Sequence, residues 1–146
     1  MHLEPAMKPG KLIGLDYGTV RTGIALTDEL QMIASPLVTV ETRKLMEYLD
    51  TMLSKENIVG IVLGEAKRLN NTPSEITALQ QKFADSLAKK YPLMTIYRVN
   101  EMYTSKMASQ TLLMAGLKKS DRAKKENLDK VSAAIILQSY LDSRRS

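Results

Sequence analysis

One stretch near the amino end, KLIGLDYGTVRTGIALTD at residues 11–28, constrains the fold more than any other part of the chain. A short apolar run ends at Asp16, a turn follows at Gly18 and Thr19, and a second apolar run at 23–26 brings the chain back. This pattern predicts a β-hairpin whose first strand is buried on both faces. A carboxylate there costs several kcal/mol unless it is paired or binds a metal. Asp16 is therefore either a site residue or a turn former, since aspartate is common beside glycine in turns.

The composition limits which chemistry is possible. The 146 residues include no cysteine and a single histidine, His2. Disulfides, thiolate zinc sites, multi-histidine metal sites and a histidine general base are therefore excluded. With 44% hydrophobic and 25% charged residues, the chain is typical of a globular protein, which we expect in the cytoplasm and away from membranes. A net charge of +5 permits binding to a polyanion but does not demonstrate it.

The hydrophobic pattern beyond the hairpin alternates between strands and helices. The expected elements are an edge strand at 36–40, a helix at 45–53 capped by Thr42, a buried parallel strand at 58–63, a helix with a capping box at 72–75 that ends before Pro92, a strand at 94–99, a helix at 102–115, a charged linker at 116–127 and a final helix from 128 to about 140. This order predicts an α/β fold: a five-stranded mixed sheet, three antiparallel strands plus two parallel, with helices on both faces. We expect one domain over residues 11–142, with a flexible lead-in at 1–10 and a frayed tail at 143–146.

Three acids are expected to meet at one edge of this sheet. Ligands gather at the carboxyl ends of parallel strands, where Asp16 closes the first strand and Glu101 follows the last. Asp129 heads the final helix and shares its apolar face with Ala133 and Ile136. Glu101 and Asp129 also have a structural explanation, as acids that complement the dipole at the start of a helix.

Carboxylates that converge repel one another, so a cation must compensate. Because histidine and cysteine ligands are lacking, Mg²⁺ or Mn²⁺ fits such an all-oxygen site best. Two such ions about 4 Å apart would activate a water, neutralise a scissile phosphate and stabilise the leaving oxygen. The three acids, Asp16, Glu101 and Asp129, are thus the candidate catalytic and metal-binding residues for phosphodiester hydrolysis without a protein nucleophile.

These motifs resemble those of the YqgF/RuvX family, an RNase H-like group described as Holliday junction resolvases or pre-16S rRNA nucleases. GLDYGTVRTGIALTD is similar to the family's first signature, NEMYTSKMA to the segment after the last strand, and LDKVSAAIILQSYL to the closing signature. The resemblance covers residues 11–141. It implies an RNase H-like fold, metal-dependent nuclease chemistry at the three acids, and either maturation of the 5′ end of small-subunit rRNA or cutting of branched DNA.

Two positions depart from the family pattern. Asn100 stands where relatives often carry an aspartate, and Glu65 lies in a Gly-Glu-Ala segment where they often have Gly-Leu-Pro. Both changes leave the three acids in place but alter the surroundings in which a substrate would lie.

Basic and hydroxyl side chains near the motifs are candidates for nucleic-acid contacts. Arg21 follows the first turn and is close enough in sequence to reach a phosphate at Asp16, although a surface arginine would look the same. Thr104 and Ser105 open a helix whose free N–H groups favour anions, and they fit equally well as helix caps. The segment before Asp129 is dense in cations, which would follow the phosphate backbone or simply form a solvated linker. These cations are Lys118, Lys119, Arg122, Lys124 and Lys125.

Three functions stay open from the sequence. The first is a metal-dependent endonuclease on structured nucleic acid, chiefly at the 5′ end of pre-16S rRNA within a ribosomal small-subunit precursor, with a Holliday junction as the alternative substrate. The second is nucleotide hydrolysis of the actin and sugar-kinase type, because DYGT before a returning strand resembles that superfamily's first phosphate loop; that type, however, needs two domains. The third is a non-catalytic RNA- or ribosome-associated module with the same fold. The pattern selects neither RNA over DNA nor a monomer over a homodimer.

Overall fold

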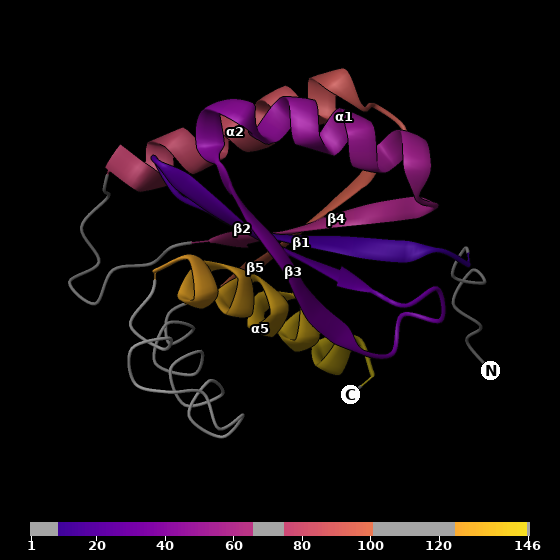
Figure 1. Cartoon of the computed structure of the whole chain (residues 1–146). Coiled ribbons are helices and arrows are strands. Elements are labelled where there is room, and N and C mark those ends of the chain that lie inside the picture. The colour runs from indigo at the N-terminus through magenta and orange to yellow at the C-terminus, as the bar shows by residue number, and fades with distance from the viewer. Residues whose placement is uncertain (1–8, 66–74, 101–124, 146) are drawn as a thin grey trace.

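The computed structural model of the protein describes residues 9–65, 75–100 and 125–145. Within these residues, five strands form one sheet that has helices on both faces (Figure 1). The strands are β1 (Lys11–Tyr17), β2 (Arg21–Thr27), β3 (Ala34–Glu41), β4 (Ile58–Glu65) and β5 (Thr95–Asn100). The helices are the 3₁₀ turn η1 (Thr42–Lys44), α1 (Leu45–Lys55), α2 (Glu75–Lys90) and α5 (Lys125–Arg145).

The strands lie in the order β3-β2-β1-β4-β5. β1, β2 and β3 form an antiparallel meander, while β4 pairs in parallel with β1, and β5 with β4. Parallel neighbours require long crossovers, and here α1 precedes β4 while α2 precedes β5. The predicted mixed sheet is therefore confirmed, with β3 at its edge.

β1 separates two hydrophobic layers. Its Ile13 and Leu15 pack with α1 residues such as Leu49, on the face that α1 and α2 cover. Leu12 lies on the opposite face and packs with Leu137 of α5. Figure 1 shows α1 and α2 on one side of the sheet and α5 on the other. Successive side chains of a strand point to opposite faces, so a strand buried between two layers must be apolar on both faces. The hairpin pattern predicted this burial of the first strand.

Thr42 does not cap α1 as predicted. It lies in η1, and its hydroxyl donates to the carbonyl of Gly18 over 2.6 Å. The residue before α1, Lys44, makes no side-chain cap. The threonine therefore ties the start of this helical segment to the β1–β2 turn.

The last helix is longer than predicted at both ends. It begins at Lys125, so 125–127 of the predicted linker are helical, as the high helix propensity of lysine and glutamate allows. It also continues to Arg145, where the sequence predicted a frayed tail from residue 143. Arg144 explains this difference, since its guanidinium lies 5.2 Å from the centre of the Tyr140 ring and donates to Gln31 over 2.9 Å. Other predicted features lie outside the described residues, namely the lead-in up to residue 8, the capping box before Glu75 and the helix at 102–115.

Candidate active site

Gly23 of β2 is the point where three elements meet. It is the cross-strand partner of Asp16 on β1, and the backbone of Asp129 on α5 lies directly against it. A Cβ atom at Gly23 would come within 1.9 Å of the Asp129 carbonyl oxygen, so only glycine lets the helix sit this close. Directly opposed residues of an antiparallel pair project to the same face. The half-buried Asp16 and Asp129 therefore belong to the same face of the sheet.

Arg21 joins the hairpin to α5. Its Nε donates to the Asp129 carboxylate over 3.1 Å, and the two side chains are 35% and 27% exposed. A pair this exposed is screened by water and contributes little to stability, in the range of about 0–1 kcal/mol. The ion pair can therefore be exchanged for other partners at little cost. The sequence predicted that Arg21 lies near the site, and the structure places it against one of the acids.

The parallel strands fix the edge at which the site lies. β1 and β5 both pair in parallel with β4, so their carboxyl ends lie at the same edge of the sheet, two strand spacings or about 10 Å apart. In register, Leu15 lies beside Leu63, and Leu63 beside Arg98. Asp16, the last residue but one of β1, thus lies at the level where β5 approaches its last residue, Asn100. Glu101 follows Asn100 in the chain but lies outside the described residues.

Polar contacts hold the turn beyond Asp16 in place. Because the Thr42 hydroxyl donates to Gly18, the Thr22 hydroxyl must donate to Thr42, over 2.9 Å. The buried Gln80 of α2 donates to the Tyr17 carbonyl over 3.1 Å. Tyr17 itself stacks on Phe83, with ring centroids 4.7 Å apart. Tyr17 is thus a packing residue, and neither Thr42 nor Gln80 had a sequence signal for this supporting role.

The remaining candidates from the sequence can be divided by whether the structure describes them. Lys125 is the first residue of α5. The others lie outside the described ranges: Glu101, Thr104, Ser105, Lys118, Lys119, Arg122 and Lys124. Within the described ranges, no three acids or histidines group closely enough to hold a metal ion. The described part of the site is therefore a pair of carboxylates, Asp16 and Asp129, with one arginine.

A family model described as "RuvX: Holliday junction resolvase" matches residues 10–143. The chain belongs to the RuvX family. Three similar curated proteins carry the name "Putative pre-16S rRNA nuclease". The protein from Christiangramia forsetii is 46% identical over 90% of this chain and 97% of its own length. Those from Flavobacterium johnsoniae and Bacteroides thetaiotaomicron are each 43% identical over 92% of this chain and 98% of their own.

A solved structure confirms the fold of this RuvX family member. The RuvC protein of T. thermophilus, in complex with a Holliday junction substrate, superimposes with a TM-score of 0.59 and 16% sequence identity, over 93% of this chain and 96% of the other. The predicted RNase H-like fold is therefore confirmed. No helix among the described residues has the length and apolar character that crossing a bilayer requires.

Proposed function

We propose that this protein is a metal-dependent endonuclease that hydrolyses phosphodiester bonds in structured nucleic acid. One observation carries the proposal: Gly23 pairs with Asp16 and accommodates the backbone of Asp129. Two acids far apart in sequence thereby share one face at the carboxyl edge of the sheet. Glu101, directly after β5, is proposed as the third acid. The names of the RuvX relatives support this class of activity.

The 5′ end of pre-16S rRNA is the substrate we favour. Relatives at 43–46% identity are named for that substrate, whereas the solved structure that holds a Holliday junction shares only 16% identity. A Holliday junction is the second candidate, because the family description names it. Trimming one strand needs one active site, which a monomer supplies, whereas resolving a junction needs two, as in a homodimer. Action on an rRNA precursor would place the protein in the cytoplasm.

The donor set suits Mg²⁺ or Mn²⁺, two ions in the simplest arrangement. Asp16, Asp129 and Glu101 offer only carboxylate oxygens, the ligands that these hard cations prefer. When bound, such ions would activate water and offset the charge that builds on the phosphate. Arg21 holds the Asp129 carboxylate and can also bind a phosphate through its terminal nitrogens. The hydroxyl pair at 104–105 and the cations at 118–125 are proposed to contact the nucleic-acid backbone.

The decisive experiment compares Asp16→Asn and Asp129→Asn with the wild type on a precursor rRNA and on a four-way DNA junction, each with Mn²⁺. We expect both variants to bind and neither to cleave. Asp85→Asn is the matched control, because it removes an exposed carboxylate on α2, which covers the opposite face. Cleavage by Asp16→Asn at the wild-type rate would reveal a contaminating nuclease or a wrong site. A wild type that binds both substrates but cuts neither would favour the non-catalytic module.

A further inference from the structure

A groove of about 320 Å³ lies beside the acid pair, between β3 and the first turns of α5. Its lining residues come from three elements, and they are Arg21, Leu37, Val38, Thr39, Val40, Glu41 and Lys130. Across the sheet, Asp16 pairs with Gly23, and Gly23 pairs with Thr39. Asp16 and the groove thus lie on either side of β2, whose Gly23 contacts the backbone of Asp129.

The charges around the groove leave it positive. Arg21 lines the groove and is paired with Asp129 through Nε. Glu41 is the groove's one acid, and it is already balanced, by Arg43 at 2.9 Å and Lys44 at 3.8 Å. The hydrogen bond from Arg43 also lowers the pKa of Glu41, so this carboxylate stays ionised and paired at neutral pH.

Lys130 supplies the net positive charge. It follows Asp129 on α5, is half-buried, and forms no ion pair with any residue that the structure describes. The opposite wall of the groove is β3, where Thr39 pairs with Gly23 and therefore projects toward the α5 face, while Val38 and Val40 pack into the core on the other face. A lysine and an arginine that line one groove suit a nucleic-acid backbone, because phosphate oxygens are the usual acceptors for such cations.

We propose that this groove binds a backbone phosphate of the nucleic-acid substrate, distinct from the phosphate that is cut. Lys130 is its main ligand, and Arg21 bridges that phosphate and Asp129. The inference rests on the proposed function for its substrate class, and it adds the direction of the strand, from the acids past the start of α5 toward the β3 edge. Such a contact positions the strand without reading its sequence.

The first test measures the salt dependence of binding for Lys130→Gln. Fluorescent precursor rRNA and a four-way DNA junction are titrated at a series of KCl concentrations, with EDTA present so that neither is cut. Losing one phosphate contact should weaken binding about five- to tenfold at low salt and reduce the slope of log K against log[KCl] by about one. Both nucleic acids should respond, because both carry the phosphate.

Lys89→Gln is the matched control, since it removes the same charge from an exposed lysine near the end of α2, on the opposite side of the sheet. Its slope should equal that of the wild type. If Lys130→Gln also keeps the wild-type slope, the groove does not hold a phosphate and the proposal is overturned. Thermal melting of both variants ensures that folded proteins are compared.

A second test locates the phosphate by replacing one linkage at a time with a neutral methylphosphonate. We expect one position, away from the cleaved bond, where the wild type loses affinity and Lys130→Gln loses none. Equal sensitivity of the two proteins at every position would overturn the assignment. If the wild type binds with the full salt slope but cuts nothing, the nuclease proposal fails while the groove stands. If the wild type cuts and Lys130→Gln binds with the wild-type affinity and salt slope, the nuclease proposal stands and the groove proposal fails.

Discussion

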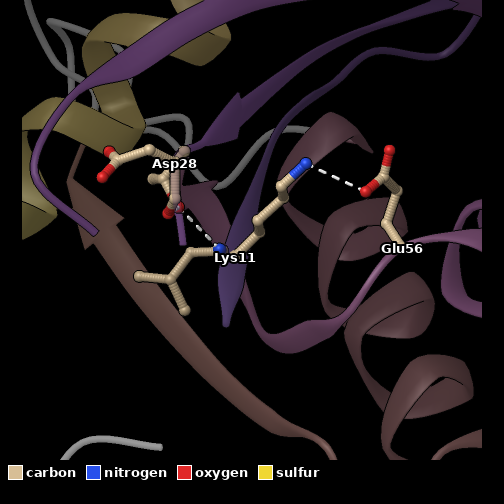
Figure 2. Close-up of polar contacts among 5 residues, drawn as sticks. Lys11, Asp28 and Glu56 are labelled. Carbon is tan, nitrogen blue, oxygen red and sulfur yellow. Dashed lines mark hydrogen bonds and ion pairs between the residues drawn. The ribbon is translucent and has the colours of Figure 1, made fainter. Parts of the chain in front are cut away.

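The two ends of the β1–β2 hairpin are built in opposite ways. At the amino end of β1, polar groups close on one another: Lys11 Nζ lies 2.9 Å from a Glu56 carboxylate oxygen (Figure 2), and Leu12 N–H donates to the Thr27 hydroxyl over 2.8 Å. Asp28 accepts three backbone N–H groups of the loop that follows it, at 3.1, 2.9 and 2.9 Å. These hydrogen bonds lower the pKa of Asp28, the one from Ile33 most of all. The contacts at the amino end of β1 therefore fix the conformation of the loop after Asp28.

At the carboxyl end of β1, the ion pair among the described residues joins Arg21 to Asp129, an acid of the candidate site. Asp16 and Asp129 belong to the same face of the sheet, and Lys130 forms no ion pair with any described residue. Gly23 contributes no side chain and lets the helix approach instead. Partly exposed pairs of this kind are cheap to exchange for a ligand. From this difference we expect that one end of the hairpin serves stability and the other serves binding, so substitutions should separate the two properties.

The largest effect is expected from Gly23→Ala. The new methyl group would lie within 1.9 Å of the Asp129 carbonyl oxygen, and backbone cannot rotate away as a side chain can. The start of α5 must shift by roughly 1 Å, which can cost about a hundredfold in cleavage rate. Overpacking should also lower the free energy of unfolding by about 1–3 kcal/mol. Single-turnover cleavage and urea unfolding measure the two effects.

Gly60→Ala is the control for that prediction, as a second glycine-to-alanine change in the sheet. Its methyl group would meet side-chain atoms of Leu12 and Tyr97 at 2.8 and 3.0 Å, and the Thr95 carbonyl oxygen at an ordinary contact distance of 3.6 Å. We expect lower stability but an unchanged cleavage rate per folded molecule. If both variants lose cleavage equally, the site depends on the whole face rather than on the Gly23 contact.

Gln31→Ala should produce the opposite pattern at the other end of the hairpin. Gln31 is only 4% exposed; its amide donates to the Gly10 carbonyl and accepts from Arg144, both over 2.9 Å. Leaving these groups unsatisfied should cost about 2 kcal/mol in the free energy of unfolding. Cleavage per folded molecule should stay at the wild-type rate. Gln81→Ala, an exposed glutamine on α2, should change neither, and a loss of cleavage in Gln31→Ala would show that α5 couples the two ends.

Arg21→Gln should have a smaller effect, with opposite signs for metal binding and for nucleic-acid binding. Removing the cation beside Asp129 should tighten Mn²⁺ binding about two- to fivefold, in keeping with the modest energy of a partly exposed pair. The same change should weaken nucleic-acid binding. Calorimetric titration with Mn²⁺ and the binding assay test both, with Arg98→Gln, an exposed arginine that contacts α2, as control. Weaker Mn²⁺ binding would mean that Arg21 orders the acids rather than opposing the metal.

The sequence predicted the sheet because the relevant signals are local. Each signal indicates one strand, helix or turn: an apolar run, an acid before a glycine turn, or a change in the period of the hydrophobic pattern. The family motifs then pointed to Asp16 and Asp129 together. Glu101 stays a prediction, because it lies outside the described residues.

What the sequence did not predict depends on contacts between distant segments. The Arg21–Asp129 ion pair joins residues 108 positions apart, and the fit of α5 against Gly23 requires the docking position of a helix on a strand. Lys130 looked like one of many lysines until the groove beside β3 showed where it lies. The full length of α5 was missed for the same reason, since Arg144 finds Gln31 only in the folded chain.

The smallest effect should come from Asp28→Asn, and it should depend on pH. The folded pKa of Asp28 lies below the ordinary value because the loop N–H groups favour the charged carboxylate. The carboxylate therefore stabilises the fold above about pH 4, and this contribution is lost as the pH falls through the lowered folded pKa. Urea midpoints should show a small gap between wild type and variant at pH 7 that closes in acid. Asp85→Asn, at an exposed acid that accepts one side-chain bond, is the control. A gap that persists unchanged at low pH would mean that the charge of Asp28 does not stabilise the amino end of β1. The contrast with the carboxyl end of β1, where Asp16 lies, would then weaken.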